Sequence, residues 1–163
     1  KGCVSSVSCA KLDPKVDARF RPGRFSNDIQ VNQDPNSHFI KGDSVKILAH
    51  ELYHSLTLCG KNGFTDWEKV LNKAGSNITG QSARCARAMA EELIGYYCSD
   101  MCSSLSSCAG KAYQSGNVQS VCANVWIKAS VGSPLYNAVS QFFAELPTIC
   151  NDINKGCDKY KPK

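Results

Sequence analysis

The chain has 163 residues, 42% hydrophobic and 20% charged, with a formal net charge of +5. This composition is typical of a globular protein and excludes bulk disorder, and the length predicts a single domain, 1–163. The basic residues are scattered rather than gathered with aromatics in a stripe, so we expect no nucleic-acid partner. The chain has no run of 18 apolar residues and does not open on a signal peptide pattern. We therefore expect a mature form whose export signal has already been removed, without a transmembrane segment and acting as a monomer.

The first third of the chain predicts a loop-rich arm, one strand and one helix. Residues 1–23 carry two cysteines and two prolines without a sustained period, which predicts an arm pinned by disulfides. Residues 24–33 place Phe25, Ile29 and Val31 close to alternation, which predicts a half-buried strand. "DPNS" (34–37) is typical of a turn.

A helix is predicted from Ser44 to a stop near Cys59-Gly60. Asp43 is suited to the N-cap, and the apolar residues after it follow a helical period: Val45, Ile47, Leu48, Leu52 and Leu56.

The rest of the chain is helix-rich. The pattern predicts helices over 64–75 and 82–98, and over 133–150 with Ser133 as cap and an end at Pro147. Residues 117–131 fit either a helix or a strand, and the helix is favoured. Between Cys98 and Cys108 we expect a stapled turn region. The fold class expected is therefore α+β, helix-rich and disulfide-stapled.

Ten cysteines are spread along the whole chain, at positions 3, 9, 59, 85, 98, 102, 108, 122, 150 and 157. No C-x-x-C pair is present, and the closest spacings fit no common structural zinc pattern. A disulfide framework of up to five bridges is therefore favoured, although spacing does not define its connectivity. Such a framework predicts a secreted, extracellular or periplasmic protein.

The stretch "ILAHELYHSL" (47–56) holds two of the three histidines in an H-E-x-x-H pattern. On a helix, His50 and His54 lie one turn apart on one face, where both imidazoles can bind one Zn²⁺. Glu51 lies beside them, where it can act as general base toward a zinc-activated water that attacks a carbonyl. His38, the third histidine, is expected at the surface. We therefore predict one zinc ion per chain and peptide hydrolysis.

"LAHELYHSL" (48–56) resembles the zincin metallopeptidases. Thr57 and Gly60 stand where the metzincin extension needs glycine and histidine, and no segment matches the aspartate motif of the deuterolysin-like branch. With "AEEL" (90–93), the wording is similar to the gluzincin pattern of clostridial neurotoxin light chains and related bacterial toxin or effector proteases. The resemblance implies a compact zincin fold, in which a small sheet lies over the active-site helix and its edge pins an extended peptide.

A third protein ligand must complete such a site, and three glutamates compete: Glu91, Glu92 and Glu145. Glu145 lies much farther along the chain than the resemblance implies. In the helix predicted over 82–98, Glu92 falls at the border of the buried face, whereas Glu91 should face solvent. The resemblance also places the ligand on the second glutamate of "EEL". Glu92 is therefore the predicted third ligand.

A group that stabilises the oxyanion is also expected opposite the base. The sequence does not choose among six candidates: Tyr96, Tyr97, Tyr113, Tyr136, Arg84 and Arg87.

The leading functional hypothesis is a secreted zinc endopeptidase acting on protein or peptide, in the manner of a toxin or effector. Two alternatives stay open: a disulfide-rich binding or structural protein that carries the motif without metal, and a zinc hydrolase that acts on a non-protein amide or cell-wall peptide. Neither the substrate nor glycosylation at the sequon of Asn77 follows from the sequence.

Overall fold

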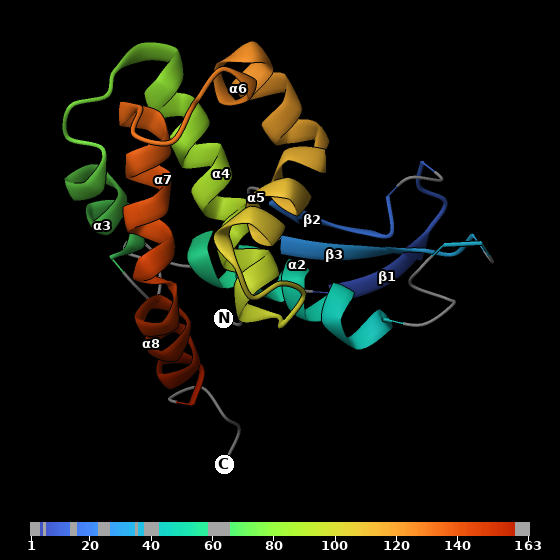
Figure 1. The fold of residues 1–163 in the computed structure, drawn as a ribbon. Helices are drawn as coiled ribbons and strands as arrows, with labels where there is room; N and C mark the ends of the chain where they lie inside the picture. Colours follow the sequence, from blue (N-terminus) through green and yellow to red (C-terminus); the bar gives the residue numbers. More distant parts are fainter. Residues whose placement is uncertain are drawn as a thin grey trace.

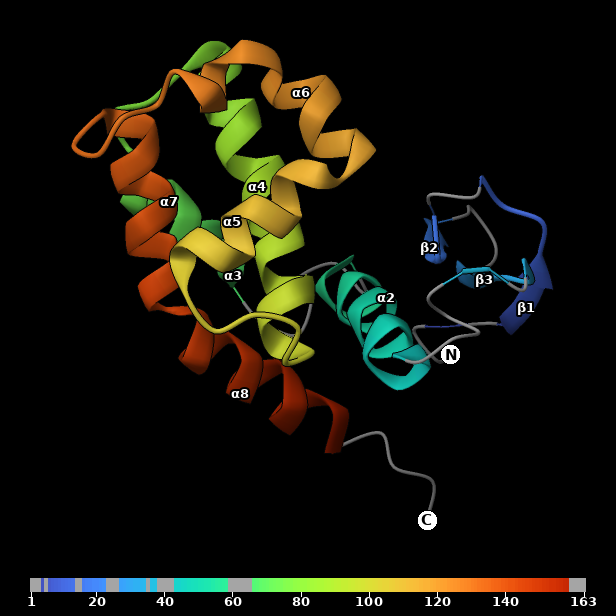
Figure 2. The ribbon, with the colours of Figure 1, turned by 45° about the vertical axis from the view of Figure 1, so that its right-hand side comes forward.

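The protein is described by a computed structural model that covers residues 4, 6–13, 16–22, 27–34, 36–37, 43–58 and 66–158. In these residues the fold is helix-rich α+β, with a three-stranded sheet and seven helices (Figure 1). Helix α2, Ser44–Leu58, lies between the sheet and the other helices (Figure 2). The α+β expectation is thereby confirmed at the level of class.

The sheet consists of β1 (Ser6–Ala10), β2 (Ala18–Pro22) and β3 (Asn27–Asn32), in the order β1-β3-β2. β1 runs parallel to β3, and β2 runs antiparallel to it. β3 matches the predicted strand, within its described residues. The prediction of a loop-rich arm over 1–23 is wrong, because β1 and β2 lie there. Each has only five residues and a largely exposed surface, so neither shows a sustained apolar period.

A buried asparagine holds the connection between β1 and β2. The side-chain amide of Asn32 donates to the carbonyls of Asp13 (3.2 Å) and Val16 (2.8 Å). Its Oδ1 accepts from the amides of Asp34 (3.1 Å) and Leu12 (3.4 Å). These bonds satisfy a fully buried polar side chain, and they fix the point at which β2 begins.

Helix α2 begins where the sequence predicts. The amide of Ile47 donates to the carbonyl of Asp43 at 2.9 Å, which places Asp43 at the first helical bond. The predicted stop at Cys59-Gly60 lies outside the described residues. α2 packs against β2 and β3 on one side and against α4 on the other, so it joins the sheet to the helical body.

Six further helices form the body (Figure 1): α3 (Trp67–Ala74), α4 (Gly80–Cys98), α5 (Leu105–Gln114), α6 (Gly116–Ile127), α7 (Pro134–Ala144) and α8 (Leu146–Asp158). The predicted helices over 64–75, 82–98 and 117–131 are confirmed within a few residues. The helix predicted from Ser133 to an end at Pro147 begins as predicted and ends at Ala144. A second helix that was not predicted begins at Leu146, and Pro147 lies in its first turn, where a proline needs no helical hydrogen bond. α5 was not predicted, because serines dominate its start.

α4 is the central helix and contacts α2, α3, α5, α6, α7 and α8. Its predicted inner face is buried at Ala86, Met89 and Leu93. Two disulfides extend from it, Cys85–Cys122 to α6 and Cys98–Cys150 to α8, and a third, Cys102–Cys108, closes the turn before α5.

The three disulfides indicate an oxidising environment. Cys9 is exposed and has no disulfide partner among the described residues, and Cys3 and Cys59 lie outside them. Among the described helices, none is long and apolar enough to cross a membrane.

Candidate metal centre

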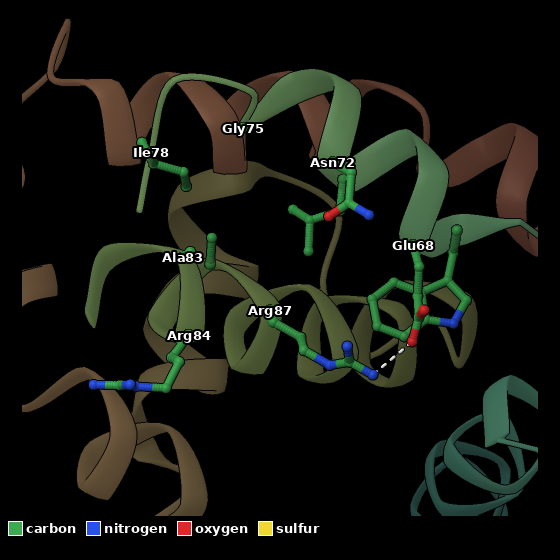
Figure 3. Close-up of a pocket in the computed structure, with 10 residues that line it drawn as sticks. Glu68, Asn72, Gly75, Ile78, Ala83, Arg84 and Arg87 are labelled. Atoms are coloured by element: carbon green, nitrogen blue, oxygen red, sulfur yellow. Dashed lines mark hydrogen bonds and ion pairs between the residues drawn. The ribbon is translucent and has the colours of Figure 1, made fainter. Parts of the chain in front are cut away.

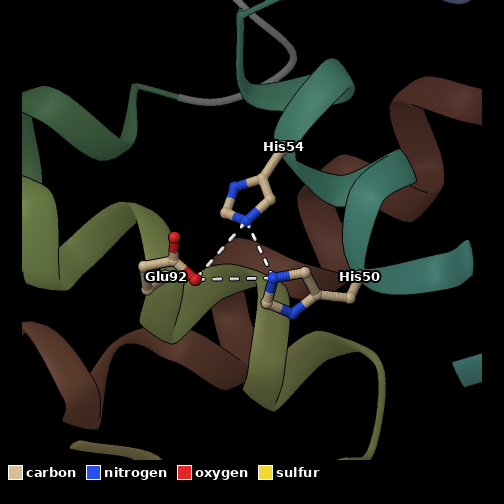
Figure 4. A group of neighbouring side chains, drawn as sticks. All are labelled: His50, His54 and Glu92. Atoms are coloured by element: carbon tan, nitrogen blue, oxygen red, sulfur yellow. Dashed lines mark hydrogen bonds and ion pairs between the residues drawn. The ribbon is translucent and has the colours of Figure 1, made fainter. Parts of the chain in front are cut away.

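Two helices bring three ligand-type side chains together. His50 and His54 project from the same face of α2, with their Nε2 atoms 2.9 Å apart. Glu92 projects toward them from α4, with Oε2 3.4 Å from Nε2 of His50 and 3.7 Å from Nε2 of His54 (Figure 4). One donor atom from each residue therefore points to a common centre, and the group could hold a metal ion.

The spacing of the donor atoms can be compared with that of a metal site. With metal–ligand bonds of about 2.0–2.1 Å in a tetrahedral site, neighbouring donor atoms lie about 3.3 Å apart. The two histidine–glutamate separations, 3.4 and 3.7 Å, are close to this value. The histidine pair at 2.9 Å is tighter, and a small rotation of one ring would open it. Two imidazoles and a carboxylate therefore fit a divalent metal in both chemistry and spacing.

The two competing glutamates lie elsewhere. Oε1 of Glu91 accepts from Nε of Arg87 at 3.4 Å, and the side chain is 27% exposed, which is less than expected for a residue facing solvent. Glu145 is exposed at the end of α7. Of the three candidates, the structure brings Glu92 to the two histidines.

Glu92 is oriented by a residue that the sequence did not indicate. The hydroxyl of Ser115, at the junction of α5 and α6, donates to Oε1 of Glu92 at 2.9 Å. This bond occupies one carboxylate oxygen and leaves Oε2 for the histidines. Burial favours the neutral form of Glu92, but its interactions with the nearby imidazoles of His50 and His54 outweigh burial and hold the pKa of the carboxyl well below its usual range. Glu92 is thus ionised, as a ligand must be.

Gly95 makes room for His50. It lies almost one turn after Glu92 on α4, and a Cβ at this position would lie 2.7 Å from Cε1 and 2.8 Å from Nδ1 of the imidazole. The ring also contacts Tyr96, with the two ring centroids 4.3 Å apart. Nδ1 of His50 is buried and has no hydrogen-bond partner among the residues that the structure describes. The imidazole is therefore positioned by packing against α4 rather than by a hydrogen bond at its second nitrogen.

Glu51 lies beside this group, between α2 and the sheet. The side chain is buried, and burial raises the pKa of its carboxyl above the ordinary value, although His54, His50 and the backbone amide of Phe20 act in the opposite direction. The amide of Phe20 belongs to β2. The acid–base group predicted from sequence is thus in contact with the strand nearest to α2.

Of the six candidates for oxyanion stabilisation, Tyr96 lies at the site. Burial and then the charges of Glu92 and Glu51 raise the pKa of Tyr96 to about 12, so its phenol remains a hydrogen-bond donor at neutral pH. The other five contact residues outside the group: Tyr97 packs on Phe143, Tyr136 stacks on Trp126, Tyr113 donates to the carbonyl of Ala123, Arg84 donates to Gln81, and Arg87 pairs with Glu68 and Glu91.

A cavity of about 280 Å³ lies apart from this group, between α3 and α4 (Figure 3). Its walls include Trp67, Leu71 and Ile78, and Arg87 crosses it to pair with Glu68. None of the three ligand-type residues lines it, and we assign it no role in the chemistry.

Comparison with protein-family models, with curated proteins and with solved structures finds no match to this chain. The case for function therefore depends on the geometry of the site.

His38 lies outside the described residues. The sequence analysis did not identify Ser115 or the amide of Phe20, because no pattern in the sequence marks either of them. Gly95 could have been noticed, because an isolated glycine inside a helical pattern commonly marks a close approach.

Proposed function

We propose that the chain is a secreted zinc-dependent endopeptidase, with His50, His54 and Glu92 as the ligands of one Zn²⁺. The observation that carries the proposal is the convergence of these side chains from two helices, with a buried carboxylate next to them. A chance pair of histidines on a helix would not require a third ligand from a separate element. The approach of Glu92 from α4 is the part of this convergence that the H-E-x-x-H pattern does not itself contain.

When bound, Zn²⁺ would supply a Lewis acid that polarises the scissile carbonyl and makes water a better nucleophile. Glu51 would accept the proton of the attacking water and later deliver it to the leaving amine, and its raised pKa brings it closer to the neutral range in which such a group works best. The phenol of Tyr96 would donate a hydrogen bond to the carbonyl oxygen as negative charge develops there.

β2 would hold the peptide. In support of this role, β2 is an edge of the described sheet and packs on α2, and the backbone of Phe20 interacts with the carboxyl of Glu51. An extended peptide adding to β2 would be bound through its backbone, largely independently of sequence, and its scissile bond would lie above α2.

The decisive experiment joins metal content to cleavage. Protein purified without added metal should contain one zinc per chain, and it should cleave an unstructured protein such as casein in a reaction that a chelator blocks. Glu51→Gln should keep the zinc and lose activity by several orders of magnitude, because glutamine cannot accept the proton. No metal after reconstitution with zinc would leave a binding or structural protein. Metal without proteolysis would favour a hydrolase of another amide.

The assignment of Glu92 as the third zinc ligand is tested by comparing two alanine variants. Glu92→Ala should lose zinc and activity together, whereas Glu91→Ala, one residue away and paired with Arg87, should retain both. Retention of zinc by Glu92→Ala would contradict the proposed ligand.

A further inference from the structure

The backbone of β2 has a defined free side. The amide of Asn32 donates to the carbonyl of Asp17 at 2.8 Å, and the register pairs Arg19 with Gln30 and Arg21 with Asp28. In an antiparallel pair, alternate residues carry the ladder bonds, so Arg19 and Arg21 direct their backbone groups to β3. The backbone groups of Ala18 and Phe20 point the other way, and of these the Phe20 amide is already engaged by Glu51, which leaves both groups of Ala18 and the carbonyl of Phe20 for a further strand.

β2 packs on α2, the helix that carries two of the ligand-type residues, and two electrostatic interactions connect its free side with the site. The amide of Phe20 reaches the carboxylate of Glu51, as its alternation predicts. The charge of Asp17, immediately before β2, acts on Tyr96. Pro22, at the end of β2, has no amide to present, which is tolerated at a sheet edge. A peptide paired with β2 would therefore run between this strand and the residues of the metal centre.

The side chains of β2 alternate between two different faces. Ala18 and Phe20 share a face with Val31 and Ile29, which are buried against α2. Arg19 and Arg21 lie on the opposite, solvent face and are both exposed. Nε of Arg19 donates to Gln30, a neutral side chain, at 3.0 Å. Arg21 lies opposite Asp28, an acidic residue on the same face, so Arg19 is the cation of β2 whose cross-strand neighbour is neutral, and Arg21 shares its charge with Asp28.

We propose that β2 selects extended peptides that carry acidic side chains at alternate positions. A residue that pairs with a strand projects to the same face as the residue opposite it, and opposite charges in such pairs attract. Two acidic residues separated by one position would lie opposite Arg19 and Arg21 together, whereas two adjacent acidic residues would project to opposite faces. This inference rests on the proposed function in one respect, namely that the peptide bound to β2 is a substrate.

The test measures peptide binding without cleavage, by fluorescence anisotropy with the Glu51→Gln protein. Three labelled peptides of equal length have glutamates at alternate positions, glutamates at adjacent positions, or glutamines at the alternate positions. The first two have the same charge and composition, so a difference between them reports register rather than net attraction to a basic protein. Each favourable pair should tighten binding about 1.5- to 5-fold, and two pairs about 2- to 25-fold.

Variants identify the residues. Arg19→Gln and Arg21→Gln should each remove about 1.5- to 5-fold of the preference for alternate glutamates, while Lys128→Gln, an exposed cation beyond α6, should leave it unchanged. Equal binding of all three peptides, binding too weak to measure, or an equal effect of the three variants would overturn the inference. Preferred binding of the alternate peptide with no cleavage by zinc-loaded wild-type protein would uphold it and refute the peptidase function instead.

Discussion

Gly95 offers the sharpest test of the site, because alanine would normally be an improvement at its position. In the interior of a helix, alanine is favoured over glycine by about 1 kcal/mol. Here the added Cβ would lie 2.7–2.8 Å from the imidazole of His50, much closer than van der Waals contact. Either the imidazole or the α2–α4 packing must move.

The expected size of the effect follows from these two opposing contributions. Overpacking a well-packed site costs about 1–3 kcal/mol, so the net change in the free energy of unfolding of Gly95→Ala should lie between about zero and 2 kcal/mol of destabilisation. Gly110, inside α5, is the matched control, because a Cβ there meets no described atom within 4 Å beyond its chain neighbours and the nearby backbone of its own helix. Gly110→Ala should stabilise the protein by up to about 1 kcal/mol.

Metal binding separates the two variants further. Displacing His50 should weaken zinc binding by about 10–100-fold, the range seen when the support of a ligand is removed, whereas Gly110→Ala should bind zinc normally. Urea unfolding in the presence of a chelator measures the first effect, and zinc titration against a competing indicator measures the second. If Gly95→Ala were stabilised like Gly110→Ala and bound zinc with unchanged affinity, the close packing of His50 on α4 would be refuted.

Three further predictions follow from the surroundings of the site. Ser115→Ala should weaken zinc binding by about tenfold or more, whereas Ser115→Thr, which keeps the hydroxyl, should retain most of the zinc affinity. Equal zinc affinities of the two variants in a titration would show that the hydroxyl does not orient Glu92. Replacing both Cys85 and Cys122 with alanine should lower the free energy of unfolding by about 4 kcal/mol for a bridge with a sequence separation of 37, and denaturant curves without a shift would argue against the bridge. Burial lowers the pKa of His54, but the carboxylate of Glu92 has the larger effect and raises that pKa above 6.5. The interaction of protonated His54 with Glu92 therefore stabilises the metal-free protein fully below pH 6.5, and this stabilisation is lost as the pH rises through the raised pKa. Because zinc must displace this proton, its affinity should fall as the pH decreases through the raised pKa, and calorimetry in two buffers at pH 6.5 should detect proton release; heats independent of the buffer would contradict it.

The sequence determined those parts of the protein that depend on local pattern. The H-E-x-x-H spacing on an apolar period placed His50, Glu51 and His54 on one helix, since a helix repeats every 3.6 residues whatever surrounds it. Helical phase also separated Glu92 from Glu91, because the buried face of α4 is defined by its own apolar residues. Caps marked helix starts, as at Ser133, whose hydroxyl accepts from the amide of Tyr136.

Tertiary structure decided everything that joins segments far apart in the chain. β1 and β2 were missed because their pairing with β3, rather than any internal pattern, makes them strands. Ser115 reaches Glu92 only because α5 and α6 fold back along α4. Tyr96 was one of six equal candidates until the approach of α2 and α4 set its ring against His50. Local sequence encodes which groups a helix presents, but only packing between elements determines which groups meet.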